Sequence, residues 1–170
     1  MGTIKLYQKD NIEMQRALIE FVENSEACAV AHVVSAHVGQ IFFAYVFVED
    51  GVVAGLSGLF KNKYVSCEEL LVVREGFQGR GIATKLQTRL LAHAHNVGLS
   101  VTLTTFDTEE YKHVIRLYKK FNFVQLGKFK QRLLFGLNTN NKMFNFRRIL
   151  IFYYLSFCKE LLLSIKSSKK

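Results

Sequence analysis

Cysteine is scarce in this sequence, and proline is absent. The three cysteines, Cys28, Cys67 and Cys158, lie far apart and form no C-x-x-C pair. So sparse and odd a set argues against a disulfide framework and for free thiols in a reducing compartment. The first ten residues are mixed and polar, without the basic stretch and apolar core of an export signal. We therefore expect a cytoplasmic protein; the residues offer no physical reason for the missing proline.

Long apolar runs and metal-ligand clusters are also missing. The apolar run near the C-terminus, Ile149 to Cys158, has ten residues, whereas a bilayer span needs about 20. Extending it to Ile165 would place Lys159 and Glu160 within the membrane, at a cost of several kcal/mol. His32 and His37 have no second ligand at metal-binding spacing, and His93, His95 and His113 read as helix-surface residues, so no metal is expected.

What remains is the composition of a folded domain. Of the 170 residues, 49% are hydrophobic and 22% charged, which is enough for a packed core. The net charge of +9 is uneven, because the seven basic residues and one acidic residue from Lys142 onward contribute +6. The rest of the chain carries only +3 and does not indicate a nucleic-acid surface. We predict a main domain over residues 1–141 and a basic, apolar, helical extension over residues 142–170.

The stretch from Glu68 to Thr84 carries the strongest local signal. Its residues 70–73 form an unbroken apolar run, which is typical of a strand covered on both faces. Gly76, Gly79 and Gly81 follow within six residues, so the backbone can bend tightly there and approach a ligand. From Ile82 the apolar positions take helical spacing. The helix would then start at a glycine-rich turn and direct free N–H groups and its positive dipole end toward an anion.

The spacing of the turn distinguishes it from other glycine loops. It fits neither G-x-G-x-x-G, because Thr84 follows in place of glycine, nor the Walker pattern. Residues 78–83, Gln-Gly-Arg-Gly-Ile-Ala, fit Q/R-x-x-G-x-G/A. This loop resembles the pyrophosphate loop of the GNAT superfamily of acyl-CoA-dependent N-acetyltransferases. The alternative is an ordinary strand, turn and helix without a ligand.

Strands elsewhere are predicted from apolar runs and turn residues. They are expected over residues 3–7, 41–48, 52–60, 65–73, 100–106, 123–129 and 132–137. The Asp50-Gly51 pair between two of these runs is a strong signal for a tight hairpin. The middle of the chain therefore reads as an antiparallel meander leading into the glycine turn.

Helices are predicted from periodicity and caps. They are expected from a cap at Asp10 or Asn11 to residue 23, over 25–37, over 82–96 with Gly98 as the stop, and after a cap at Asp107 or Thr108. The first should bury Ile12, Leu18, Ile19 and Val22. Together the elements predict one α/β domain whose mixed, mostly antiparallel central sheet is flanked by helices.

A second segment strengthens the resemblance. Residues 115–123, Ile-Arg-Leu-Tyr-Lys-Lys-Phe-Asn-Phe, are similar to the GNAT segment A-I-x-L-Y-x-K-x-G-F. The likeness then covers roughly residues 3–138. Asn122 stands where glycine is usual, a mild departure because asparagine tolerates a left-handed backbone. Val114 replaces a common alanine, and Tyr111 replaces an asparagine that often contacts the cofactor, so that contact is not carried over.

The resemblance implies a co-substrate and a site for it. Acetyl-CoA would be bound, and residues 1–141 would form an N-acetyltransferase domain. The pyrophosphate would lie on the backbone of Gln78, Gly79, Arg80, Gly81, Ile82, Ala83 and Thr84. The strand before the turn would splay from its neighbour at the CoA site. There Leu71 and Val73 would pair with the pantetheine arm, and the N–H of Val72 or Val73 would face the thioester oxygen.

The resemblance also implies catalytic residues. Glu69 would be the base that deprotonates a substrate ammonium, directly or through water; otherwise Glu69 is a solvated charge or binds the amine. Tyr118 would be the acid that protonates the leaving thiolate, with His113 as a distant second candidate; otherwise Tyr118 is a core tyrosine. The expected activity is acetylation of a primary amine by direct attack. A non-catalytic CoA-binding module, or a transferase for another acyl-CoA or acceptor, stays open.

The acceptor and the extension remain undetermined at this level. A polyamine, an antibiotic, an amino acid, a small metabolite or a protein amine would each fit as the acceptor. The extension could pack on the domain, pair with a second copy to form a homodimer, or lie on an anionic membrane surface. The sequence favours the first two over membrane contact.

Overall fold

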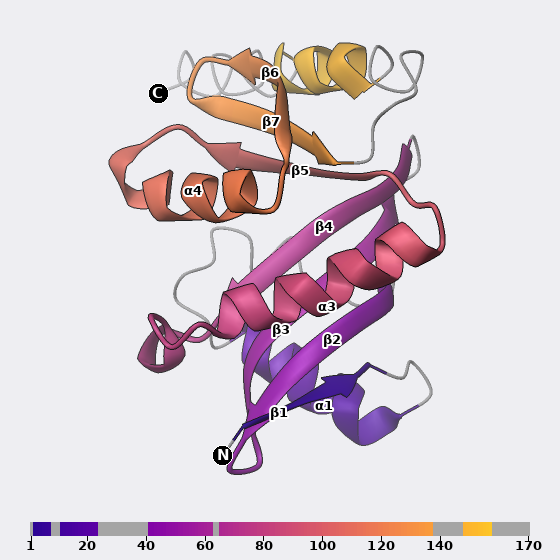
Figure 1. The fold of residues 1–170 in the computed structure, drawn as a ribbon, viewed down its shortest axis with the longest axis vertical. Coiled ribbons are helices and arrows are strands. Elements are labelled where there is room, and N and C mark those ends of the chain that lie inside the picture. Colours follow the sequence, from indigo (N-terminus) through magenta and orange to yellow (C-terminus); the bar gives the residue numbers. More distant parts are fainter. Residues whose placement is uncertain (1, 8–10, 24–40, 63–64, 138–147, 158–170) are drawn as a thin grey trace, which may run out of the picture. The chain divides into compact units, whose positions relative to one another are not determined.

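The computed structural model describes residues 2–7, 11–23, 41–62, 65–137 and 148–157 (Figure 1). For residues 22–23, 42, 60–62 and 65–69 it describes the backbone alone. The helix expected over residues 25–37 lies outside these ranges. The chain divides into two units, residues 1–99 and 100–170, and each is described by itself.

The first unit contains an antiparallel meander of four strands. They are β1 (Thr3–Leu6), β2 (Ile41–Glu49), β3 (Val52–Asn62) and β4 (Val65–Val73), and each pairs with the next. The hairpin between β2 and β3 turns at Asp50 and Gly51, whose φ angles are 51° and 79°. Two positive φ angles match the twist of the flanking strands, so the tight hairpin expected from Asp-Gly is confirmed.

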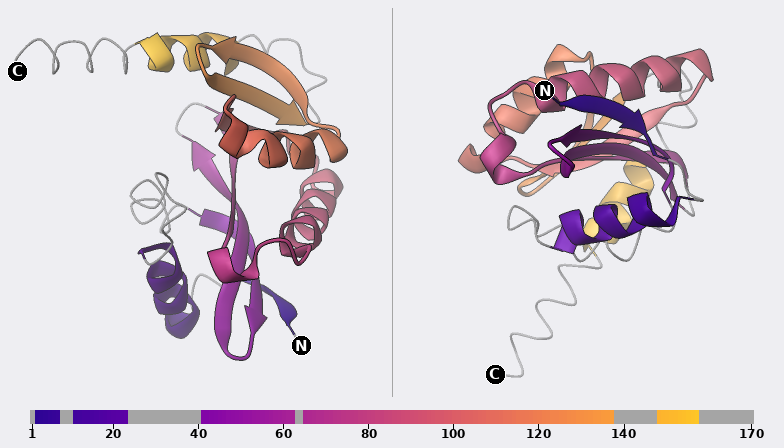
Figure 2. Two further views of the ribbon diagram at one scale, coloured as in Figure 1. Left: turned by 90° about the vertical axis from the view of Figure 1, so that its left-hand side faces the viewer. Right: turned by 90° about the horizontal axis from the view of Figure 1, so that it is seen from below.

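Helices cover both faces of this meander (Figure 2). On one face, α1 (Ile12–Glu23) buries Leu18 and Phe21 in a cluster with Ala44, Val46, Leu56 and Leu70. On the other face, α3 (Ile82–Asn96) buries Ile82 and Leu86 against Phe47 and Ala54. The strands therefore alternate their side chains between two apolar layers, as expected for a sheet covered on both sides.

The start of α1 was predicted correctly, but its buried face was not. Asn11 caps the helix, since its Oδ1 accepts a hydrogen bond from the Met14 N–H at 2.9 Å. The expectation that Ile12 and Ile19 are buried is wrong, because they are 64% and 38% exposed. Instead, residues 14, 17, 18 and 21 face the sheet, in the i, i+3, i+4, i+7 pattern of one helical stripe. The side chain of Val22 lies outside the described part.

The second unit contains a three-stranded antiparallel sheet in the order β5-β7-β6. The strands are β5 (Val101–Phe106), β6 (Val124–Phe129) and β7 (Arg132–Leu137), so the pairing expected for the last two strands is confirmed. Helix α4 (Lys112–Lys120) connects β5 to β6. Asn122 follows the C-cap residue Phe121, and its φ of 62° is the left-handed conformation that asparagine was expected to tolerate. A further helix, residues 148–157, packs on this sheet.

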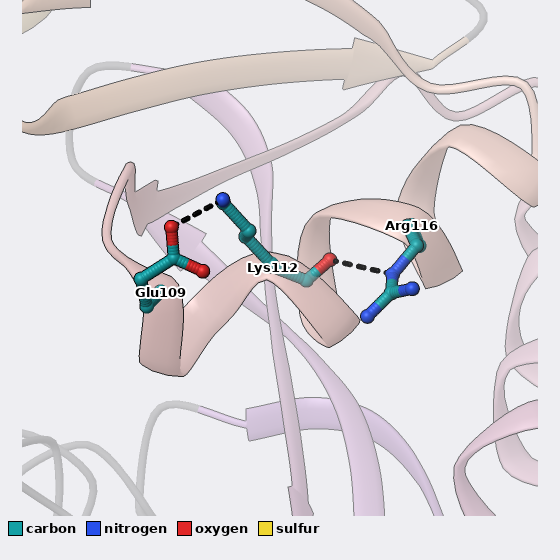
Figure 3. Close-up of polar contacts among 3 residues, drawn as sticks. All are labelled: Glu109, Lys112 and Arg116. Carbon is teal, nitrogen blue, oxygen red and sulfur yellow. Dashed lines mark hydrogen bonds and ion pairs between the residues drawn. The ribbon is translucent and has the colours of Figure 1, made fainter.

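The start of α4 differs from the predicted side-chain cap. A 3-10 turn, η3 (Glu109–Tyr111), precedes the helix, and Thr108 at its N-cap makes no side-chain capping bond. The Asp107 carboxylate instead pairs with Lys128 at 2.6 Å, which leaves it engaged across the sheet. The Lys112 ammonium contacts the Glu109 carboxylate, and the Lys112 carbonyl accepts a bond from Arg116 Nε at 3.4 Å (Figure 3).

No helix formed by the described residues is long and apolar enough to cross a membrane.

Candidate functional site

The glycine-rich turn connects β4 to α3 in the first unit. After Val73 the chain forms a 3-10 turn, η2 (Glu75–Phe77), and α3 begins at Ile82. Gly79 and Gly81 both have φ of 74°, a left-handed conformation that costs a side-chain-bearing residue roughly 1–2 kcal/mol. A Cβ built at either glycine, or at Gly76, would meet no atom within 4 Å. The turn therefore needs two glycines for its backbone, and its surface is open to a ligand.

The turn ends at the N-terminus of α3. Gly81 is the N-cap residue and has no side chain to cap the helix, and the first turn contains no acidic residue. The first N–H groups of a helix have no partner within it, and here they belong to Ile82, Ala83 and Thr84. The helix dipole adds a positive partial charge at the same point. These groups fit a diphosphate, because amides and dipole both stabilise phosphate oxygens.

Hydrogen bonds hold the entry to the turn in place. The Arg74 N–H donates to the Ala54 carbonyl of β3 at 2.9 Å. Gln78 closes the turn twice: its backbone N–H donates to Glu75 O at 3.0 Å, and its Nε2 donates to Val73 O at 3.3 Å. The glutamine of the motif thus links the turn to the end of β4, which positions the following amides.

The direction of the β4 backbone groups follows from its pairing with β3. Arg74 directs its N–H toward β3, and in an antiparallel pair alternate residues direct both backbone groups to the same side. Val72 then also directs its N–H toward β3, whereas Leu71 and Val73 direct theirs away from β3, in a register without irregularity over this part. The backbone groups of Leu71 and Val73 therefore point to the side of β4 away from β3. Of the two amides considered for the thioester oxygen, this register favours Val73.

An ion pair at the turn was not predicted. Arg80, half exposed, places Nη2 2.6 Å from Oε2 of the mostly buried Glu49, and its guanidinium lies 5.2 Å from the centre of the Phe77 ring. The available signal was topological. In an antiparallel meander, β2 and β4 run in the same direction. The last residue of β2 therefore lies at the same end of the sheet as the turn that follows β4. The main cation of the turn is thus already paired when no ligand is present.

The two predicted catalytic residues belong to different units. Glu69 lies on β4 opposite Leu59, two residues before Leu71, and its side chain is outside the described part. Tyr118 lies on α4 and is only 5% exposed. Its ring packs edge-on against Phe123 with centroids 5.3 Å apart. Tyr118 is therefore well ordered by packing, and the roles of both residues stay predictions.

Metal chemistry has no obvious site in the described ranges. No group of three or more His, Cys, Asp or Glu side chains gathers there in a way that could hold a metal ion. The chemistry available to the first unit is thus recognition of an anion by main-chain amides at the end of β4.

Comparisons with known proteins agree with this geometry. The family model described as acetyltransferase (GNAT) family matches residues 5–123, more than half of the chain. An acetyltransferase of the GNAT family from Streptococcus pneumoniae has a TM-score of 0.63 at 15% identity, covering 81% of this chain and 99% of that one. The ribosomal-protein-S18-alanine N-acetyltransferase from Escherichia coli has a TM-score of 0.62 at 14% identity, with coverage of 81% and 93%.

A third solved structure, aminoglycoside 6'-acetyltransferase type Ii, has a TM-score of 0.61 at 17% identity, covering 79% of this chain and 96% of that one. At these identities the structural likeness shows the shared fold. A comparison with curated proteins gave no match.

The fold and the family match define an acetyltransferase of the α/β class. Because the family model covers more than half of the chain, from β2 through the glycine-rich turn to α4, the chain belongs to the GNAT acetyltransferase family. The sequence-based expectation of this family, and of a mixed, mostly antiparallel fold flanked by helices, is confirmed.

Proposed function

We propose that this protein transfers the acetyl group of acetyl-CoA to a primary amine by direct attack. The observation that carries the proposal is the turn between β4 and α3. Two left-handed glycines leave the first amides of α3 uncapped and open, in the motif where the family binds a diphosphate. An amide-lined diphosphate site at the end of β4, whose Leu71 and Val73 direct backbone groups away from β3, suits a long, phosphorylated thioester better than a small anion.

Each part of the co-substrate has a proposed contact in the chain. Amides of residues 79–84 would bind the diphosphate, with Gln78 holding the turn in shape through Val73. The backbone groups of Leu71 and Val73 would pair with the pantetheine arm as an extra strand would. The Val73 N–H would then lie where a donor stabilises negative charge on the thioester oxygen.

The proposed reaction needs one base and one acid. Glu69 would accept a proton from the substrate ammonium, and the neutral amine would attack the carbonyl carbon. As the tetrahedral intermediate collapses, the carbon–sulfur bond breaks and the electron pair leaves on sulfur. Tyr118 would donate its proton to that thiolate, and the resulting tyrosinate would accept the proton that the attacking nitrogen loses as the amide forms, while Glu69 releases its proton to water. The products are an acetylated amine and free CoA thiol.

An amine acceptor is favoured by the names of structurally similar enzymes. One acts on the alanine of ribosomal protein S18 and another on aminoglycosides, and both names imply an amino group as the acceptor. They differ so widely in size that neither identifies the acceptor here.

The test is acetyl-CoA turnover over a panel of amines, followed by release of free thiol. The panel would contain a polyamine, an aminoglycoside, free amino acids and peptides with a free N-terminal amine. We expect thiol release that depends on one class of amine and appears with acetylated product. CoA binding by calorimetry without turnover on any amine would favour a non-catalytic module, and turnover only with another acyl-CoA would correct the donor. Absence of binding heat on titration with CoA would overturn the proposed function.

A further inference from the structure

The helix of residues 148–157 has two unlike faces. Its inner face consists of Arg148, Phe152 and Ser156, spaced four residues apart and all buried. Phe152 lies over Gly127 of β6, where a Cβ built on the glycine would be 3.5 Å from the ring. This face belongs to the packed interior of the second unit.

Polar bonds fix the orientation of the helix on the sheet. Arg148 Nη2 donates to Thr102 Oγ1 of β5, and Arg132 Nη1 of β7 donates to Ser156 Oγ at 3.3 Å. The Tyr153 hydroxyl donates to the Lys128 carbonyl of β6 at 2.9 Å. The helix is thus held along its length, and a rotation that would bury the opposite face would break these contacts.

The outer face carries a stripe of large apolar side chains. Leu150, Tyr154 and Phe157 are 53%, 68% and 60% exposed, and their i, i+4, i+7 spacing places them opposite the buried row. Tyr153, 40% exposed, lies beside the stripe, whereas Leu155, 48% exposed, lies next to the buried row. Surface apolar residues are ordinary when scattered, but a contiguous group on one helix indicates a contact surface.

The charge of the adjoining sequence indicates what covers this stripe. From Lys142 onward the chain contains seven basic residues and one acidic residue, and of these only Arg148 belongs to the buried row. Apolar and aromatic side chains on one face of a helix, within a strongly basic segment, are the features of helices that lie in the interface of anionic membranes. Tyrosine suits the membrane–water interface because its ring is apolar and its hydroxyl is polar.

A second copy of the chain fits these observations less well. Symmetric pairing through the stripe would bring two segments of net charge +6 together. Among the described residues, the five exposed apolar side chains of this helix fall short of the roughly 20–30 residues that each partner contributes to a stable interface. We propose that the outer face of residues 148–157 docks this acetyltransferase on an anionic lipid surface. The inference is independent of the acceptor and of the catalytic residues.

Vesicle co-sedimentation of the full chain tests the proposal. The vesicles would be phosphatidylcholine alone or phosphatidylcholine with about one-third phosphatidylserine. Since each cation near an anionic surface is worth about 1 kcal/mol, or about fivefold, we expect at least a fivefold higher partition onto the anionic vesicles. Raising the salt from 0.1 to 0.5 M should reduce that partition about threefold or more, because the Debye length shortens.

A matched pair of variants separates the stripe from general surface apolarity. Tyr154→Ser with Phe157→Ser should lower partition at least fivefold. Leu6→Ser with Val97→Ser, which removes exposed apolar side chains from the first unit, should leave it unchanged. Circular dichroism melts would show that both variants fold, as expected for exposed positions.

Two outcomes would overturn the proposal. One is equal partition on anionic and neutral vesicles, or on the stripe variant and its control. The other is a lipid-free dimer, seen by sedimentation velocity, that becomes monomeric in the stripe variant, because the stripe would then be occupied by a second copy.

Discussion

The guanidinium of Arg80 lies 2.6 Å from the carboxylate of Glu49, although 31 positions separate them in the chain. Parallel strands β2 and β4 bring the two residues to one edge of the meander. The pair holds the cation of the diphosphate turn against a carboxylate that repels phosphate. In the free protein, Glu49 therefore competes for the charge that a diphosphate would use.

Replacing Glu49 by glutamine should strengthen CoA binding. The variant removes a negative charge and leaves Arg80 available to the diphosphate. We expect the dissociation constant for CoA, measured by calorimetry at low salt, to fall two- to fivefold, where fivefold is about 1 kcal/mol. Asp50→Asn removes the next carboxylate in the same hairpin and is the control. Weaker binding by Glu49→Gln would mean instead that Glu49 positions Arg80 for the ligand.

The two left-handed glycines give a prediction with an internal control. Gly79→Ala and Gly81→Ala each place a Cβ on a backbone with φ of 74°, so each should lower the free energy of unfolding by about 1 kcal/mol or more. Gly76→Ala adds the same methyl group in equally open space without a positive φ and should cost much less. Urea unfolding measures the three variants. Equal losses at all three positions would contradict the argument from backbone conformation.

The same variants should separate stability from binding. A methyl group at Gly81 lies beside the first amides of α3, so we expect at least tenfold weaker CoA binding by calorimetry. Gly76→Ala should bind within about twofold of the unchanged protein. Binding is measured at a temperature at which urea unfolding shows that each variant is fully folded.

The part of the fold that the sequence predicted best is governed by local rules. The bounds of β4 and α3 agree with the expected ones, and Gly98 ends α3 as predicted, with φ of 68°. The N–H groups of Gly98 and Leu99 donate to the carbonyls of His95 and Ala94, as in a glycine-terminated helix. Apolar runs, glycines and caps specify such features within a few residues, so one sequence suffices to read them.

What the sequence missed depends on contacts between distant residues. Helix α1 has apolar residues on more than one side, and only the sheet determines that Phe21, and not Ile12 or Ile19, is buried. The partner of Arg80 likewise follows from strand order, which local patterns do not contain. Asp107 was expected as a helix cap, but Lys128, 21 positions later, engages its carboxylate.

The catalytic assignments need kinetic variants. If Glu69 is the base, Glu69→Gln should lower kcat at pH 7 by about 10²- to 10⁴-fold, the usual contribution of general base catalysis. At high pH the rate of this variant should partly recover, because the amine then loses its proton to solvent without the carboxylate. Glu68→Gln, which changes the neighbouring residue in the same way, is the control. An unchanged rate for Glu69→Gln across pH 6 to 9, roughly the range over which an amine and its base titrate, would remove Glu69 from the mechanism.

Tyr118→Phe tests the proposed acid with little change of shape. The ring and its edge-on contact with Phe123 remain, and only the hydroxyl is lost. As an acid, Tyr118 should account for about 10²-fold or more in kcat, with KM for acetyl-CoA nearly unchanged. The loss should shrink for a thioester whose leaving thiol is more acidic, because such a thiolate needs no proton. A fall in melting temperature with full kcat would assign Tyr118 to the core.

The pair between Asp107 and Lys128 should make part of the stability depend on pH. Lys128 Nζ donates to the carboxylate at 2.6 Å, and this bond and the ammonium charge lower the pKa of Asp107 below its ordinary value of 3.8. The unfolded chain therefore binds the proton more readily. The pair's contribution is fully present above the unfolded pKa and is lost as the pH falls through the folded pKa. Asp107→Asn should thus melt slightly below the unchanged protein at pH 7, and the gap should close at a pH below 3.8.

A double-mutant cycle isolates this contribution from other effects of the two substitutions. Lys128→Met removes the partner, and the coupling between Asp107→Asn and Lys128→Met should be favourable at pH 7, weaken with added salt and vanish once the pH lies below the folded pKa of Asp107. The backbone bond from the Asp107 N–H to Gln131 O, at 2.6 Å, persists in every variant, so β5 keeps its end contact with the turn between β6 and β7. A coupling energy that stays constant with pH would mean that the charge on Asp107 is not what the pair contributes, and that packing of the lysine stem accounts for the effect.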